Sequence, residues 1–357
     1  MNAASFDFLK RLLDTPGPSG FETAPARIWR AEAKGFAHRL ETDVMGNSLA
    51  TLHPGGAPRV MLAGHIDEIG VMVTHIDDEG MLSVDGIGGW DPQVLVGQRI
   101  RLLSRAGDVV GVVGKKPIHL IRPDEREKAS RMTDLWIDVG ARDGDDAHSR
   151  GLRVGDPGVI DAQLVELGNG RIASRSVDNR IGAYVVLEAL RRLAEAGDPA
   201  PAVTAVATTQ EEIGHSGGGA RSAAYALDPQ VAIVVDVTFA TDAPGVEKKQ
   251  VGEHKLGSGP VLGRGSATHP LVFERLAETA EREGIPFTIQ GNPRFTSTDA
   301  DAIYLSRAGV ATAIVSVPNR YMHSPNEIVS LDDLDATADL IASFCRDLRE
   351  AGDFIPR

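Results

Sequence analysis

The sequence is poor in the residues that mark several protein classes. Its 357 residues include one cysteine, Cys345, which excludes an internal disulfide and is typical of a reducing compartment such as the cytoplasm. Aromatic residues make up only 5%, which disfavours a broad aromatic binding pocket. No apolar run approaches the roughly 20 residues that a membrane-spanning helix needs. Asp7, Lys10 and Arg11 place charge where a signal peptide needs an apolar segment, so we expect neither a membrane protein nor a secreted one.

Basic residues are scarce relative to acidic ones. The chain has 37 Lys and Arg against 50 Asp and Glu, which gives a formal net charge of −13. The pairs Lys115–Lys116 and Lys248–Lys249 are too short to oppose that field, which would repel the phosphate backbone of a nucleic acid. We therefore exclude nucleic acid as a partner.

The remaining composition is that of a globular protein with a large core. Hydrophobic residues make up 42% and charged residues 24%. Both ends of the chain alternate apolar strands with amphipathic helices, the pattern of a mostly parallel sheet covered on both faces. We expect helices near 5–15, 22–36, 181–197, 271–284, 298–309 and 331–352, and strands near 59–67, 202–209, 230–237, 286–290 and 310–317.

The predicted secondary-structure pattern changes between about residues 70 and 168. Short strands separated by Gly, Asp and Pro turns are expected near 71–77, 81–85, 98–104, 108–114, 135–140 and 162–168. This pattern predicts a small β-barrel or sandwich. Because the α/β pattern resumes afterwards, we expect an α/β catalytic domain made of 1–70 and 168–357, interrupted by an inserted β-barrel at 71–167. One continuous α+β domain is the alternative.

Acidic and histidine residues follow the apolar strands or open a helix. They are His65, Asp67, Asp178, Glu211, Glu212, Asp236 and His323. Because the carboxyl ends of parallel strands meet at one edge of an open sheet, loops can bring such residues together there. Each residue alone has an ordinary explanation as a cap or a loop contact, but two histidines with several carboxylates are the donor set that holds zinc, cobalt or manganese.

The adjacent residues Glu211 and Glu212 are expected to have two different roles. In extended chain, adjacent side chains point in opposite directions, so one carboxylate can bind a metal while the other acts as a general base. The same geometry disfavours a glycoside hydrolase, whose two carboxylates face each other across a sugar.

A serine hydrolase is the other alternative. Residues 214–218 read GHSGG and satisfy the nucleophile motif with Ser216, and Asp299 and His323 follow in the order of a catalytic triad. Against it, three residues separate this motif from the preceding strand, and two carboxylates beside Ser216 would oppose formation of an oxyanion. A metal-binding scaffold without activity is a third possibility, disfavoured by the presence of a general base.

Six ordered motifs resemble the M42 family of co-catalytic metallo-aminopeptidases. They are AGHIDEIG, SVDNRIG, TTQEEIG, VVDVTFATDAPG, TDADAI and RYMHSPNEIVSLDDL, and the resemblance covers essentially the whole chain. It implies a phosphorylase/hydrolase-like catalytic domain, a PDZ-like dimerisation domain and assembly of dimers into a dodecamer. One departure is Ser216, which stands where many relatives carry Arg.

The resemblance also implies a role for each candidate residue. Two divalent ions, zinc or cobalt and less often manganese, would be held by His65 and Asp236 at one site, by Glu212 and His323 at the other, and by Asp178 between them. Asp67 would orient His65, and Glu211 would be the general base for attack of a metal-bridging hydroxide on short peptides, releasing N-terminal residues. The peptide bond after Asp178 is the candidate for a cis bond.

Overall fold

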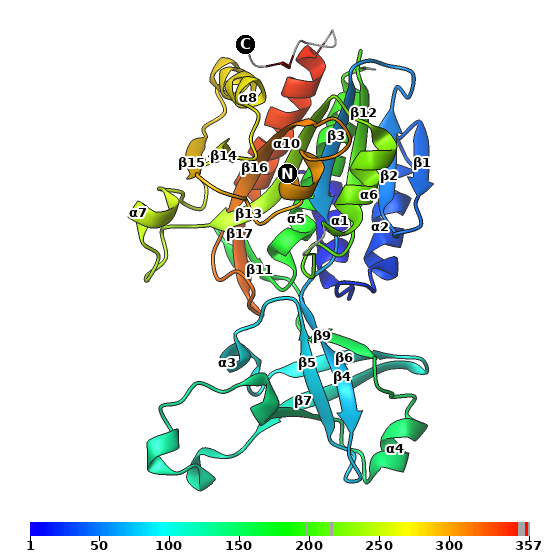
Figure 1. Cartoon of the computed structure of the whole chain (residues 1–357), viewed down its shortest axis with the longest axis vertical. Helices are drawn as coiled ribbons and strands as arrows, with labels where there is room; N and C mark the ends of the chain where they lie inside the picture. The colour runs from blue at the N-terminus through cyan, green and yellow to red at the C-terminus, as the bar shows by residue number, and fades with distance from the viewer. Residues whose placement is uncertain (198, 215–216, 349–353, 356–357) are drawn as a thin grey trace.

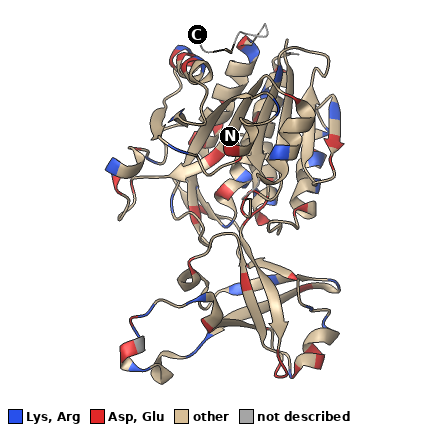
Figure 2. Ribbon diagram, in the orientation of Figure 1, with Lys and Arg blue, Asp and Glu red and all other residues tan. Residues whose placement is uncertain are grey.

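The protein consists of an α/β part and a smaller barrel below it (Figure 1). The computed structural model describes residues 1–197, 199–214, 217–348 and 354–355. The N-terminus and the last long described segment, which ends at residue 348, both lie in the α/β part. Figure 2 shows Lys and Arg interspersed with Asp and Glu over both parts. None of the helices in the described ranges is both long and apolar enough to cross a membrane.

The α/β part is built on an eight-stranded sheet. Its order is β1 (Arg39–Thr42), β2 (Ser48–Leu52), β12 (Ala202–Thr208), β3 (Arg59–His65), β13 (Val231–Phe239), β16 (Ala311–Asn319), β14 (Val261–Gly265) and β15 (Thr288–Asn292). The four central strands β12, β3, β13 and β16 run parallel, whereas β2 and β14 pair antiparallel with their inner neighbours. The central strands are buried along their whole length or nearly so, as expected of a sheet covered on both faces.

Helices cover both faces of this sheet. One face packs against α1 (Ala3–Asp14), α2 (Thr23–Ala33), α5 (Val177–Glu195), α8 (Pro270–Glu283) and α10 (Leu331–Asp347), and the other against α6 (Gly218–Leu227) and α9 (Ala300–Ile303). Strand alternation divides the core: Leu62 and Ile233 face the first group, whereas Ala63 and Val234 face the second. The sheet is therefore the middle layer of three.

The barrel is closed and antiparallel. Its strands follow the order β4 (Gly70–Ile76), β5 (Leu82–Ile87), β8 (Leu135–Asp138), β7 (Gly107–Lys115), β6 (Arg99–Ser104) and β9 (Pro157–Ile160). Val73, Leu82, Leu102 and Ile137 are fully buried in a core separate from that of the α/β part. Short helices α3 (Pro92–Leu95) and α4 (Gly144–Ser149) and three 3-10 turns (Ile118–Leu120, Pro123–Glu125 and Met132–Asp134) connect the strands.

A third, three-stranded sheet lies where the two parts meet (Figure 1). It contains β10 (Val165–Gly168), β11 (Arg171–Ser174) and β17 (Glu327–Ser330), all antiparallel. The short helix α7 (Lys248–Val251) lies on the loop after β13. Two residues separate β11 from α5, and β17 is followed at once by α10, so this sheet joins the segment that follows the barrel to the last segment of the α/β part.

The predicted fold class is confirmed: a mostly parallel sheet with helices on both faces, interrupted by a small all-β barrel. Some elements differ from the expectation. The helix predicted at 298–309 is only the four residues of α9, and the segment 162–168 forms β10 in the third sheet while β9 completes the barrel. The division into 1–70 plus 168–357 and 71–167 as folding units stays a prediction.

Candidate metal centre

The carboxyl ends of the central strands bring the predicted residues together. His65 is the last residue of β3, and it pairs in register with Thr208, the last residue of β12. Asp236 lies within β13 rather than at its end, in register with Ser316 of β16. The parallel alignment explains why residues about 170 positions apart in the sequence share one point in space.

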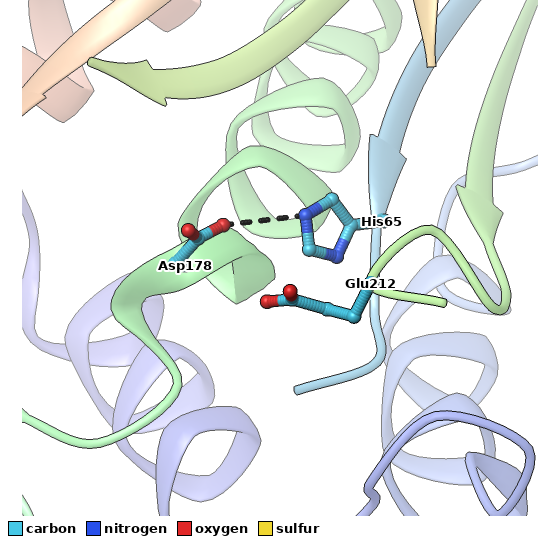
Figure 3. Close-up of side chains that lie close together, drawn as sticks. All are labelled: His65, Asp178 and Glu212. Atoms are coloured by element: carbon cyan, nitrogen blue, oxygen red, sulfur yellow. Dashed lines mark ion pairs between the residues drawn. The ribbon is translucent and has the colours of Figure 1, made fainter. Parts of the chain in front are cut away.

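Two histidines flank the carboxylate of Asp178. Nε2 of His65 lies 3.3 Å from Asp178 Oδ1, and Nε2 of His323 lies 3.4 Å from Asp178 Oδ2. His323 Nε2 is also 3.3 Å from Glu212 Oε2. Figure 3 shows the His65 ring, the Asp178 carboxylate and the Glu212 carboxylate turned toward one another from β3, the start of α5 and the loop after β12. Asp178 thus presents one oxygen to each histidine.

The second group of donors surrounds His65. Its Nε2 is 3.7 Å from Glu211 Oε2 and 3.9 Å from Asp236 Oδ1. One ligand atom each from His65, Glu211 and Asp236 lies within 4.8 Å of the others, and the same holds for His65, Asp178 and Glu212. Five carboxylate and imidazole residues therefore form two overlapping sets around one histidine, and His323 joins them through Asp178 and Glu212.

The start of α5 has an irregular backbone at the site. Asp178 and Asn179 have non-helical dihedral angles inside the helix, and the peptide bond between them is cis, as the resemblance implied. The Asn179 side chain donates a hydrogen bond from Nδ2 to the carbonyl of Val235 at 2.8 Å, which ties the helix to β13 beside Asp236.

Asp67 holds the backbone of the two adjacent glutamates. Its Oδ1 accepts a hydrogen bond from Glu211 N at 3.2 Å, and its Oδ2 accepts one from Glu212 N at 3.1 Å and one from Ser19 Oγ at 2.7 Å. The distance from His65 Nδ1 to Asp67 Oδ1 is 3.4 Å. The fully buried Asp67 therefore fixes the position of Glu211 and Glu212 as well as lying beside the imidazole.

The barrel also reaches the site. The loop after β5 brings the carbonyl of Gly89 within 2.7 Å of His323 Nδ1, which leaves Nε2 to face Asp178 and Glu212. Gly88, beside it, lies close enough that a Cβ there would be 3.4 Å from Glu212 Oε2. No local sequence pattern marks this contact, because every residue has a backbone carbonyl.

Burial and mutual repulsion set the ionisation of the carboxylates. Burial raises the pKa of Glu211 to about 10, against the opposing effect of His65 and with Asp236 adding to it. Burial, reinforced by the charge of Asp178, raises the pKa of Glu212 to about 7. Burial would lower the pKa of His323, but its contacts with Asp178 and Glu212 raise it to about 11. In the metal-free protein the carboxyl group of Glu211 therefore keeps its proton near neutral pH, and a bound cation would lower its pKa by favouring the carboxylate form.

The residues fit a divalent metal centre. Glu212 Oε1 is buried and has no hydrogen-bond partner, and His65 Nδ1 likewise has none. A buried carboxylate oxygen without a donor is unfavourable in a folded protein unless a cation satisfies it. Imidazole and carboxylate donors at this spacing suit zinc, cobalt and manganese.

A cavity of about 1740 Å³ opens beside the cluster. It is lined by the metal-site residues on one side and by α6, α9 and the loop before α9 on the other, including Arg221, Tyr225, Phe295 and Asp301. Its size allows a peptide to reach the donors from solvent.

The serine-hydrolase alternative finds little support. Ser216 lies outside the described residues. Asp299 accepts a hydrogen bond from Thr208 Oγ1 and does not contact His323 within the described part of the chain, so the expected triad order is not matched by a triad geometry.

Sequence reasoning missed several residues around the cluster. Ser19 and Glu22 lie in the loop before α2: Ser19 donates to Asp67, and Glu22 Oε1 accepts a hydrogen bond from Gln210 N at 3.1 Å, just before Glu211. Their only sequence signal was polarity next to Gly20, a pattern that is too common in loops to be informative.

A mostly parallel α/β sheet with histidine and carboxylate donors gathered at one edge is an arrangement typical of metal-dependent hydrolases. Residues 46–340 match the family model described as M42 glutamyl aminopeptidase. The chain therefore belongs to the M42 peptidase family, whose members depend on metal ions.

Individual relatives agree with this membership. A lysyl aminopeptidase from Pyrococcus furiosus is 38% identical over 354 residues, 98% of this chain and 99% of that protein. The structure of a TET aminopeptidase from a Thaumarchaeota archaeon is similar with a TM-score of 0.92 at 33% identity, covering 97% of this chain and 96% of that one. A TET1 peptidase from Pyrococcus horikoshii, which can assemble into a tetrahedron or a large octahedral shell, is 29% identical with a TM-score of 0.83, covering 96% of this chain and 100% of that one.

Proposed function

We propose that the protein is an aminopeptidase that uses two divalent ions. His65 and Asp236 would hold one ion, Glu212 and His323 the other, and Asp178 would bridge them. The observation that carries this proposal is the position of Asp178, whose two oxygens face the two histidines at 3.3 Å and 3.4 Å. Zinc or cobalt, with manganese as a further option, suits these donors.

Glu211 would act as the general base. When bound, the two ions would acidify the attacking water and polarise the scissile carbonyl. Glu211 would accept the proton at its carboxylate and deliver it to the nitrogen of the leaving amine. Asp67 would keep the Glu211 carboxylate in place, because it accepts the hydrogen bond from Glu211 N.

The substrates would be short peptides with a free N-terminus. Several buried carboxylates at one end of the cavity attract an α-ammonium group, which limits cleavage to the first residue. Relatives carry the names glutamyl and lysyl aminopeptidase, so the family accommodates N-terminal side chains of opposite charge.

Assembly and location are further parts of the proposal. A dodecamer built from dimers is supported by the solved structure of PhTET1-12s, a dodecamer, and by the tetrahedron that Pyrococcus horikoshii TET1 can form. The barrel would be the dimerisation domain. A cytoplasmic location is supported by the single, buried cysteine, Cys345.

A substrate panel with metal removal tests the function. Hydrolysis of Leu-, Glu- and Lys-p-nitroanilides is measured before and after chelation, and again after zinc or cobalt is returned. We expect activity that disappears with the chelator and returns with the metal, and the best substrate identifies the N-terminal preference. If both these substrates and defined short peptides survive metal-replete enzyme, the proposal is wrong; loss of activity to a serine-directed inhibitor with no effect of chelation would favour the serine alternative.

A further inference from the structure

Glu327 contacts the backbone of two residues at the metal centre. It is the first residue of β17 and only 2% exposed. Its Oε2 accepts a hydrogen bond from Asp178 N at 2.9 Å, and its Oε1 accepts one from His323 N at 2.8 Å. One carboxylate therefore joins the start of α5 to the loop after β16, which are 145 residues apart in numbering (323 − 178).

The charge of Glu327 has no cationic partner among the described side chains. No Lys, Arg or His in the described ranges forms an ion pair with it, and Asp178 and Glu212 are its charged neighbours. A buried carboxylate beside other carboxylates is a poor choice for stability, since each like charge adds repulsion to the loss of hydration. Its placement is better explained by what its two oxygens hold.

The loop that carries His323 needs such a restraint. It closes at Arg320 and Ile328, whose backbones exchange two hydrogen bonds of 3.0 Å. Within it, Tyr321 and His323 both have left-handed backbone conformations, with φ of 63° and 57°. These conformations are uncommon for residues other than glycine and persist when surrounding contacts hold them. The bond from His323 N to Glu327 is one of those contacts.

We infer that Glu327 is a positioning residue that sets the separation between the Asp178 carboxylate and the His323 imidazole, and so completes the second metal site. The inference rests on the proposed function. It concerns the geometry of the ligands, not the chemistry of the peptide bond, so its primary effect is on metal binding.

The variant Glu327→Gln tests this directly. Glutamine has one oxygen, which can accept one of the two hydrogen bonds, while its NH2 group would face the other N–H as donor against donor. We expect the affinity for the second ion to fall by about 10- to 100-fold, the range typical of partners that orient metal ligands, with the first ion retained.

Asp333 offers a matched control. It is 1% exposed in α10, and its two oxygens accept hydrogen bonds from Gly257 N at 2.8 Å and Gly259 N at 2.7 Å, away from the metal centre. Asp333→Asn makes the same chemical change to the same kind of buried contact. It should lower thermal stability without changing the affinity for either ion.

The experiment uses full-length wild type, Glu327→Gln, Glu327→Asp and Asp333→Asn. Each protein is stripped of metal, titrated with Co²⁺ or Zn²⁺ by calorimetry, and analysed for bound metal after dialysis. Glu327→Asp keeps two acceptors on a side chain shorter by one methylene, so it should bind the second ion with intermediate affinity. If Glu327→Gln does not fold, the metal affinities of Glu327→Asp are compared with those of wild type instead.

The outcomes separate the inference from the function. A weakened second site in the Glu327 variants, with Asp333→Asn unchanged, supports it. Two ions at wild-type affinity in Glu327→Gln, or an equal loss in Asp333→Asn, overturns it. Wild type that binds fewer than two ions would overturn the proposed function and the inference with it.

Discussion

The two parts of the molecule bury their strands in different ways. In the α/β part, all nine residues of β16 and all seven of β12 are buried. In the barrel, β5 has equal numbers of buried and exposed residues, and only two of the nine residues of β7 are buried. The difference follows from coverage, because helices cover both faces of the parallel sheet whereas the barrel shows one face of each strand to solvent.

This difference assigns the two parts different contributions to the site. Parallel strands end at one edge, so the α/β part supplies His65 from the end of β3, Glu211 and Glu212 from the loop after β12, and Asp236 from within β13. Antiparallel barrel strands end at both rims, and the barrel contributes only a loop, whose Gly89 carbonyl orients His323. The α/β part provides the candidate metal ligands, and the barrel helps to orient one of them, His323.

The largest expected effect on activity comes from a substitution in the α/β part, at the proposed general base Glu211. Glu211→Gln keeps the size of the side chain but cannot accept a proton, so we expect kcat to fall by about 10²- to 10⁴-fold with both ions retained. Steady-state kinetics and metal analysis of the same sample measure this. Because Glu211 lies in the same group as His65 and Asp236, full loss of an ion would instead mean that it is a ligand.

Core substitutions in each part should separate the two hydrophobic cores. Ile233→Ala in β13 and Ile137→Ala in β8 both remove fully buried side chains, and each should lower the free energy of unfolding by about 2–5 kcal/mol. Calorimetry should show two transitions, with each substitution shifting its own. A single transition moved equally by both would indicate one continuous cooperative unit and contradict the predicted domain division.

A change in the barrel loop should have a smaller but specific effect on the site. Gly88 has φ of +79°, and a Cβ there would lie 2.6 Å from Ile69 Cγ2, so Gly88→Ala should displace the loop beside Glu212. We expect metal affinity to fall by roughly 10-fold, as when an orienting contact is lost.

Gly97 is the matched control for this substitution. It has the same φ of +79° in the same barrel, but a Cβ there meets no atom within 4 Å. Gly97→Ala should cost about 1–2 kcal/mol of stability from backbone strain alone and leave metal binding unchanged. Equal metal affinity in both variants would show that the barrel loop does not influence the site.

The smallest effect concerns the metal-free protein and pH. The pKa of Glu211, ordinarily about 4.3, is raised to about 10 by burial, and that of His323 is raised to about 11. Both groups hold protons more tightly in the folded state, so their contribution to stability is present at low pH and is lost as pH rises toward these values. We expect the Tm of the metal-free protein to fall by several degrees between pH 6.5 and 9.5.

Two controls, the variant Glu211→Gln and wild type with added zinc, show whether the pH dependence of the Tm comes from the metal-site groups. The variant lacks one titrating group, so its Tm should depend less on pH, and added zinc should flatten the dependence in wild type. Thermal unfolding at several pH values in the presence of a chelator measures both. A Tm that rises with pH in metal-free wild type would contradict the expected protonation.

Much of the fold could be predicted because its pattern is local. Apolar runs such as 202–209 and 310–317 mark the buried strands, and the Gly-rich short strands from 70 to 168 mark the barrel. Short or irregular elements were harder. The strands β1, β2, β9, β14 and β17 have weak periodicity. The helix predicted at 298–309 is only four residues long, and Arg307 and Gly309 beyond it have left-handed backbone conformations, which a helix cannot include.

The candidate donors were predictable for a chemical reason, and their surroundings were not. Each of His65, Asp178, Glu212, Asp236 and His323 has an ordinary explanation alone, but two histidines together with several carboxylates form the donor set of a metal centre. Gly89 acts through a carbonyl that every residue has, and Glu327 through bonds to backbone N–H groups. Such contacts depend on which segments meet, so nothing in the local sequence marks them.

The sequence by itself determined the α/β class, the β-barrel and the donor types, because these depend on periodicity and side-chain chemistry. The family followed from the resemblance of six ordered motifs. Only the tertiary structure decided that Asp178 presents one oxygen to each histidine, that Asp67 holds both adjacent glutamates, and that the barrel touches His323. These are relations between segments far apart in the chain. They are fixed by packing of the sheet, helices and barrel against one another, which no local pattern records.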